Sequence, residues 1–286
     1  MKKTAATACT VSLAVLLLVF STAALAQASE ASPTAQKKDL KAIEYHYQLD
    51  PSGALDASGN LAPEFLQQMA FITWKNTPSL KRGFYVDTED RFLKSQRKVL
   101  RVRFDLAKPK KSKITLKSRG SNLARIDRLL PGTEGEIDSF FGQDQYSFAV
   151  DTPIPSKDFN LDAMTPEDAL AFLKGHNQAV YNLTAPLRDH ANISPLMRTP
   201  SATMLIFKGT AAEGPYKGMK VELQVWTLHD GAKPYLAEIG FDGDLTERPS
   251  LNAKDVWLSS QLKARNLLAA DPGTSKTELT FQAAKN

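Results

Sequence analysis

The chain has 286 residues, a formal net charge of +5 and a single cysteine, Cys9. An excess of charge this small says little about partners, because net charge alone governs solubility and nonspecific attraction. Cys9 lies in an N-terminal segment that we expect to be removed, so the remaining chain cannot form a disulfide or a cysteine-ligated metal site. The length suits one large domain or two small ones.

The N-terminus has the pattern of a cleavable export signal. Two lysines precede a short apolar core that ends in small residues at 24–26. The core is shorter than the roughly 20 apolar residues of a membrane-spanning helix, and a polar stretch follows it. We therefore predict a signal peptide over 1–26, a disordered linker over 27–38 and one folded domain over 39–286. The mature protein is then expected to be periplasmic or secreted, without a membrane span.

Apolar residues at helical spacing predict three helices. The first covers 63–75 and has Pro63 in its first turn. The second begins after Thr165, which is a suitable N-cap in front of a proline. The third begins near Asn252 and continues towards Leu267.

Other segments alternate between polar and apolar residues with a period of two, which is typical of strands. We predict six such strands, at 43–49, 97–105, 113–119, 220–228, 235–242 and 276–281. Their polar faces could lie in water, with the apolar faces on a core. Alternatively, the polar faces could line one cavity, with the apolar faces outside under the helices. The second arrangement is favoured by a face that is cationic throughout over two successive strands. This face carries Arg101, Arg103, Lys117 and Arg119.

Several short motifs follow one another in a characteristic order along these strands. They are Tyr85-Val86-Asp87-Thr88, Leu100-Arg101-Val102-Arg103, Thr115-Leu116-Lys117, Val221-Glu222-Leu223, Ala237-Glu238-Ile239 and Ser275-Lys276. In this order the chain resembles the CYTH family, the triphosphate tunnel metalloenzymes, as a diverged exported member. The resemblance covers about 40–282 and is strongest over 83–119.

The resemblance implies an α+β fold of mainly antiparallel strands, namely an eight-stranded tunnel-like barrel with flanking helices. Barrels of this size can enclose one small ligand. The polar interior would bind a triphosphate-type anion, and the family's chemistry is metal-dependent cleavage or transfer at a phosphoanhydride. The stretch 131–200 matches the family least and is a candidate helical lid or insertion.

Electrostatics favours the same ligand. Two like charges about 6 Å apart repel by roughly 3 kcal/mol at an effective dielectric constant near 20, so clustered cations call for an anion. Arginine can grip two phosphate oxygens at once, and lysine adds a point charge. The expected anion-binding residues are Arg101, Arg103, Lys117 and Arg119, with Lys208 and Lys276 as further candidates.

The acidic residues depart from the family pattern. The family's first strand usually reads E-x-E-x-K, whereas this chain has Glu44-Tyr45-His46-Tyr47-Gln48. A later E-x-E is replaced by Glu238-Ile239-Gly240. The resemblance implies a divalent metal, Mg²⁺ or Mn²⁺, held by Glu44, Glu222 and Glu238, with Glu44 and His46 as catalytic candidates. His46 could instead bind a softer ion, act as a base, or only form hydrogen bonds in the tunnel.

Two functions from different classes follow. One is an exported metal-dependent phosphohydrolase that acts on triphosphate, polyphosphate or an organic triphosphate. The other is a binding or structural protein that has lost the metal site. Nucleic-acid binding is not expected, because no aromatic residues are interleaved with the cationic strands. The sequence leaves open the substrate and the oligomeric state.

Overall fold

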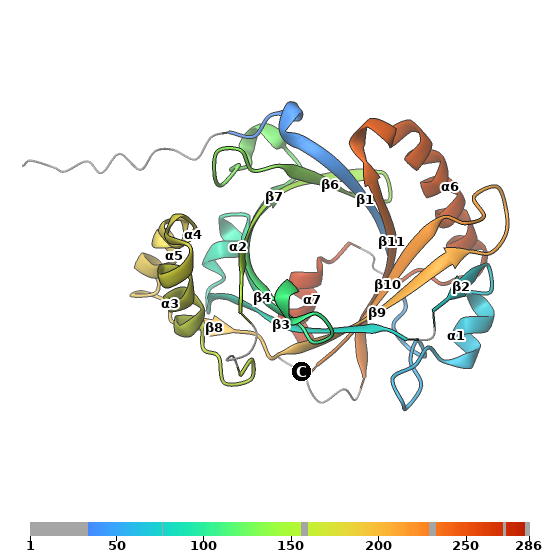
Figure 1. The fold of residues 1–286 in the computed structure, drawn as a ribbon, viewed down its shortest axis with the longest axis horizontal. Helices are drawn as coiled ribbons and strands as arrows, with labels where there is room; N and C mark the ends of the chain where they lie inside the picture. The colour runs from blue at the N-terminus through green and yellow to red at the C-terminus, as the bar shows by residue number, and fades with distance from the viewer. Residues whose placement is uncertain (1–33, 76, 156–159, 229–232, 271–272, 284–286) are drawn as a thin grey trace, which may run out of the picture. The chain divides into compact units, whose positions relative to one another are not determined.

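The computed structural model describes residues 34–75, 77–155, 160–228, 233–270 and 273–283. Within these ranges, nine strands close into a ring in which β9 pairs with both β10 and β3. In ring order they are β9 (Ala202–Ala211), β10 (Lys220–Leu228), β11 (Pro234–Asp244), β1 (Leu40–Leu49), β6 (Gly135–Phe140), β7 (Gln143–Pro153), β5 (Lys113–Gly120), β4 (Lys98–Asp105) and β3 (Ser79–Thr88). The ring is seen end-on in Figure 1.

Two short strands lie outside the ring. β2 (Ile72–Trp74) pairs with β9, and β8 (Leu196–Arg198) pairs with β3. The expected eight strands are therefore wrong: the described part of the chain has nine in the barrel and two beside it. The sheet is also mixed, because β1 and β6 are parallel. A parallel pair needs a long connection, which strands β2 to β5 supply here.

The barrel carries its apolar side chains on the outside. Tyr45, Tyr47 and Ile43 of β1 are buried in a cluster with Leu258 and Leu262 of α6 (Arg248–Ala264). Across the ring, outward side chains of β4 and β5 are buried against α3 (Pro166–His176). Figure 1 shows α6 and the α3–α5 group on the outer side of the ring. This confirms the expectation that the polar faces turn inward.

The remaining helices are short. They are α1 (Pro63–Gln68), α2 (Phe92–Ser95), α4 (Gln178–Leu183), α5 (Ala185–His190) and α7 (Lys276–Ala283), together with the 3-10 turns η1 (Lys37–Asp39), η2 (Pro109–Lys111), η3 (Leu123–Arg125) and η4 (Leu245–Glu247). No helix within the described residues is both long and apolar enough to cross a membrane.

The predicted helices differ in how well they match. The Thr165 cap is confirmed: its hydroxyl accepts from the Asp168 N–H at 3.1 Å, and the Asp168 carboxylate accepts from the Thr165 N–H at 2.9 Å. The first helix ends at Gln68, and part of its expected range is strand β2. The third begins at Arg248, and Asn252 is not its cap but accepts a hydrogen bond from the Tyr45 hydroxyl.

The predicted strand at 276–281 is wrong, because this segment forms α7. Its buried residues, Thr277, Thr280 and Phe281, recur at helical spacing. The Ser275 hydroxyl accepts from the Glu278 N–H at 3.3 Å, which helps to start the helix. A run of six residues is too short to separate the two periods reliably.

The domain boundaries predicted at the N-terminus stay predictions. The expected signal peptide over 1–26 lies outside the described residues. Of the linker expected over 27–38, residues 34–38 are described, and there Thr34 bridges to Asp127 while Ala35 is buried. The structured part therefore includes residues that we expected in the linker. The stretch 131–200 contains the barrel strands β6 and β7 as well as α3, α4 and α5.

Candidate functional site

The barrel encloses a cavity of about 920 Å³. Its wall is formed by alternate side chains of the strands and by residues 273–277, where the chain enters α7. On β1, for example, Glu44, His46 and Gln48 face the cavity, while the intervening tyrosines pack outside. The period of two in the sequence therefore separates a charged interior from an apolar exterior.

One half of the cavity wall is basic. Its cations come from three adjacent strands, which are β3, β4 and β5. They are Lys81, Arg101, Arg103, Lys117 and Arg119. The structure thus brings the four principal anion-binding candidates of the sequence analysis together on one wall.

Most of these cations have no carboxylate partner. Among the described residues, Arg101, Arg103 and Lys81 make no ion pair, and the Arg103 Nε has no hydrogen-bond partner. Within the described part of the chain, the Arg119 guanidinium donates only to the Ser275 hydroxyl, at 3.3 Å. Burial, and then the neighbouring Arg101, lower the pKa of Arg103 to about 10. This wall thus concentrates positive charge that an anion would neutralise.

The opposite half of the wall is acidic. Its carboxylates come from β10, β11, β1 and β6, which are adjacent in the ring. They are Glu222, Glu238, Glu44, Glu136 and Asp138, and Asp144 of the neighbouring strand β7 also lines the cavity. The cavity therefore has a basic side and an acidic side that face one another.

Glu44, His46 and Asp138 form a group that could hold a metal ion, with ligand atoms within 4.8 Å of one another. The parallel register of β1 and β6 places Glu44 directly beside Asp138. Burial raises the pKa of Glu44 above its ordinary value, although Lys276 and His46 oppose this. For Asp138, burial is outweighed by Lys117, His46 and Lys276, so its pKa is lowered.

The donor set of this group fits a divalent cation. The His46 Nδ1 is buried and has no hydrogen-bond partner among the residues that the structure describes, so it is available as a ligand. Two carboxylates and one imidazole suit Mn²⁺ or Zn²⁺ better than Mg²⁺, which prefers oxygen ligands. A possible chelating group is therefore present, although the acidic residues depart from the pattern that the CYTH resemblance implies.

The other two expected metal ligands lie elsewhere on the acidic wall. Glu238 is almost fully buried and binds Lys276, with a distance of 2.5 Å between Oε1 and Nζ. Glu222 accepts a hydrogen bond from Gln224 at 3.1 Å. Neither belongs to the group around Glu44, so the structure places Asp138 where the sequence suggested these two residues.

The two second-rank cations have different positions. Lys276 lines the cavity, although it does so from α7 and not from a strand. Burial tends to lower its pKa, but Glu238 and Glu44 outweigh this effect and raise the pKa above the ordinary value. Lys208 is exposed on β9 and does not line the cavity. The structure therefore brings Lys276, but not Lys208, to the candidate site.

The sequence analysis missed four charged residues of the cavity wall, which are Glu136, Asp138, Asp144 and Lys81. The Glu136 and Asp138 carboxylates accept hydrogen bonds from the Lys117 ammonium at 2.8 Å and 3.3 Å. Lys81 adds a cation from β3. Glu136-Ile137-Asp138 is itself an alternating segment and could have been recognised as an acidic strand. It was overlooked because it lies in the stretch that matches the family least.

Gly240 stands where the family has a second carboxylate, and its neighbours explain why no side chain is present. It lies opposite His46 in the β1–β11 ladder. A Cβ atom there would come within 2.4 Å of the Tyr45 carbonyl oxygen and 3.1 Å of the His46 Cβ. A carboxylate at this position would therefore require β1 to shift.

Comparisons with known proteins support the fold. Neither protein-family profiles nor curated proteins match the chain. Among solved structures, HpAC1 from Hippeastrum, described as a candidate adenylyl cyclase with a dominant triphosphatase activity, has a TM-score of 0.50 and 14% identity over 85% of this chain and 96% of that chain. A candidate adenylate cyclase from Bacillus halodurans has a TM-score of 0.41 and 17% identity over 83% and 95% of the two chains.

The fold and the cavity define the class of this protein. It is a closed β-barrel with flanking helices and a charged cavity, and its fold is similar to that of the Hippeastrum protein. At 14% identity the likeness concerns the fold alone, and it agrees with the barrel that the CYTH resemblance implies.

Proposed function

We propose that this protein is a diverged CYTH-type phosphohydrolase that binds a triphosphate-type anion in its tunnel and cleaves a phosphoanhydride bond. The observation that carries this proposal is the opposition of two walls. Arginines without carboxylate partners face a group, Glu44, His46 and Asp138, that could hold a metal. A linear phosphate chain with a divalent ion has the complementary distribution of charge.

The residues of the chain divide the work between them. Arg101, Arg103 and Arg119 hold phosphate oxygens and stabilise the charge that grows on them during cleavage. Glu44, His46 and Asp138 would hold a divalent ion, whose chemistry when bound is to polarise a phosphoryl oxygen and acidify water. Anion binding, this division of roles and the choice of Mn²⁺ over Mg²⁺ are all part of the proposal.

The first test is turnover of inorganic tripolyphosphate. We expect purified protein to release phosphate when Mn²⁺ is present, to release less with Mg²⁺, and to stop when a chelator is added. Phosphate release is measured at constant ionic strength, because surface charges are screened by salt. Release that does not depend on a divalent ion would contradict the proposed role of Glu44, His46 and Asp138.

A second candidate is a binding protein without catalysis. It is favoured by the two lysines that already neutralise carboxylates of the acidic wall, Lys117 at Asp138 and Lys276 at Glu238. In that case tripolyphosphate raises the melting temperature without being hydrolysed, because a ligand of the native state stabilises it. If tripolyphosphate is not hydrolysed and does not change the melting temperature, both candidates are contradicted.

We also propose that the protein is exported, on the basis of the N-terminal pattern alone. The expected mature N-terminus is Gln27. Mass spectrometry of the protein from the periplasm or the medium of a bacterial host measures this directly. An intact N-terminus on protein that stays in the cytoplasm would contradict export.

A further inference from the structure

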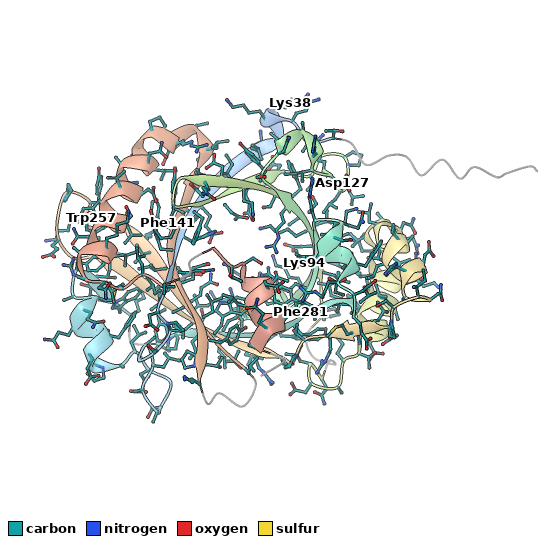
Figure 2. The ribbon with its side chains drawn as sticks, turned by 180° about the vertical axis from the view of Figure 1, so that it is seen from behind. Lys38, Lys94, Asp127, Phe141, Trp257 and Phe281 are labelled. Carbon is teal, nitrogen blue, oxygen red and sulfur yellow. The ribbon has the colours of Figure 1, made fainter. Side chains whose placement is uncertain are left out.

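A second cavity, of about 410 Å³, adjoins the tunnel at the end where α7 lies. The two cavities share wall residues, among them Tyr85, Arg119 and Ser275. The rest of the second wall comes from the chain around α2, from the turn after β5 and from α7 itself. Figure 2 views the molecule from behind and shows Lys94 and Phe281 in this region. We call this cavity the mouth.

The mouth is strongly basic. Its cations are Arg91, Lys94, Arg97, Lys98, Arg119 and Arg125, and its carboxylates are Asp87 and Glu278. Asp87 is buried, and its carboxylate accepts hydrogen bonds from the backbone N–H groups of Leu93 and Lys94 at 2.7 Å and 3.2 Å. The Asp87 oxygens are therefore engaged in holding α2. Across the described part of the chain, Arg97, Arg119 and Arg125 form no ion pair.

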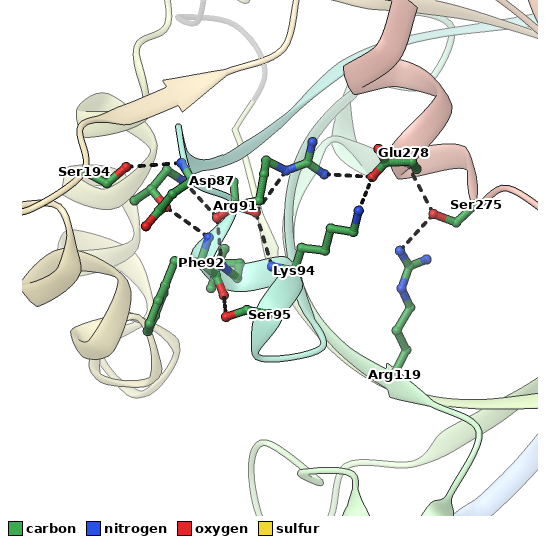
Figure 3. Close-up of polar contacts among 12 residues, drawn as sticks. Asp87, Arg91, Phe92, Lys94, Ser95, Arg119, Ser194, Ser275 and Glu278 are labelled. Carbon is green, nitrogen blue, oxygen red and sulfur yellow. Dashed lines mark hydrogen bonds and ion pairs between the residues drawn. The ribbon is translucent and has the colours of Figure 1, made fainter.

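The Glu278 carboxylate marks a point where the cations of the mouth converge. It accepts from the Lys94 Nζ at 2.7 Å and from the Arg91 Nη2 at 3.4 Å, as Figure 3 shows. The Arg91 guanidinium also lies over the ring of Phe281, 3.3 Å from its centroid. A carboxylate of α7 thus occupies a position in which a phosphate group would meet the same two donors.

Arg119 connects the two cavities. It lines both of them, and within the described residues the one hydrogen bond of its guanidinium goes to Ser275, directly before α7. Cations therefore continue from the tunnel wall through Arg119 to the mouth. Cations that extend from the tunnel into a second, adjoining cavity are the arrangement expected for a longer linear polyanion.

We propose that the mouth is a second anion site continuous with the tunnel, and that the preferred ligand is a linear inorganic polyphosphate longer than three phosphates. This inference rests on the proposed tunnel function. The phosphates beyond the tunnel bind Arg97 and Arg125 and displace Glu278 from Lys94 and Arg91, while Arg119 lies at the junction of the two cavities. Glu278 therefore competes with the outer part of the chain but not with tripolyphosphate.

The test compares tripolyphosphate with a longer linear polyphosphate of defined length. Binding is measured with a chelator present, so that no turnover occurs, and at fixed ionic strength. The variant Arg97→Gln/Arg125→Gln removes two exposed cations of the mouth. Arg97 has a positive φ of +56°, and glutamine, like arginine, has a Cβ atom, so the backbone preference at this position changes little. The control Lys110→Gln/Lys111→Gln removes two exposed cations from η2, outside both cavities.

We expect the mouth variant to bind the long chain about fivefold to tenfold more weakly, as for the loss of two exposed ion pairs, with tripolyphosphate affinity unchanged. The control is expected to bind both ligands like the wild type. The variant Glu278→Gln is expected to bind the long chain more tightly, because the competing carboxylate has been neutralised. A merely structural role of Glu278 would not produce this gain.

Two outcomes separate the proposals. The mouth site alone is overturned if the wild type binds tripolyphosphate but does not prefer the longer chain. It is also overturned if both double variants lose the same amount of affinity for the longer chain. An absence of tripolyphosphate binding in the wild type would overturn the tunnel function, and the extension with it.

Discussion

In the variant Glu44→Gln, phosphate release from tripolyphosphate is expected to fall by about 100-fold or more, because even outer partners of metal ligands cost 10–100-fold when they are lost. Glu44 is the one residue common to the ligand set implied by the sequence and to the group found in the structure. The amide keeps the size of the side chain but removes the negative charge that a divalent ion needs. Initial rates over a range of Mn²⁺ concentrations measure the effect.

Two further variants decide between the ligand sets. If Glu44, His46 and Asp138 hold the ion, Asp138→Asn lowers activity about as much as Glu44→Gln does. Glu222→Gln is the matched control, because it removes one carboxylate from the same wall outside this group. A larger loss in Glu222→Gln than in Asp138→Asn would show that the ligand set implied by the family resemblance is the correct one.

The second large effect is expected on stability. Lys276→Met leaves the Glu238 carboxylate, which is 3% exposed, without its ion-pair partner. Breaking a fully buried pair costs about 3–5 kcal/mol, and because the Lys276 side chain is 26% exposed we expect a loss of about 1–3 kcal/mol. Urea unfolding at neutral pH measures this difference in the free energy of unfolding.

The pH dependence of this loss has a defined sign. The pKa of Lys276 is raised above its ordinary value of 10.5 on folding. The pair therefore stabilises the fold fully at neutral pH, and this contribution is lost only as the pH rises through the raised pKa. The deficit of the variant is thus expected to be present at pH 7.

A double variant provides the control. Lys276→Met/Glu238→Met removes both charges and keeps two side chains of similar size, so we expect it to regain most of the lost stability. If Lys276→Met has the same free energy of unfolding as the wild type, water replaces the Lys276 ammonium at the Glu238 carboxylate. Such a result would contradict the view that this pair anchors α7 to β11.

Several misses in the sequence analysis have identifiable physical causes. The β6–β7 hairpin turns at Phe141 and Gly142, both with positive φ (+47° and +77°), and this turn lacks the Asn-Gly or Asp-Gly pair that signals such turns most strongly. α7 was mistaken for a strand because alternation over six residues can also arise on a helix. The cap at Thr165 was found because its capping box is entirely local.

The sequence by itself determined which side chains share one face of each strand, because the period of two along a strand assigns alternate residues to opposite faces. It also supplied the order of motifs that indicates the barrel and the cations Arg101, Arg103, Lys117 and Arg119. Only the tertiary structure decided which carboxylates meet. Glu44 and Asp138 are adjacent because β1 and β6 pair in parallel across the intervening strands, and no local pattern encodes the pairing of strands so distant in the chain.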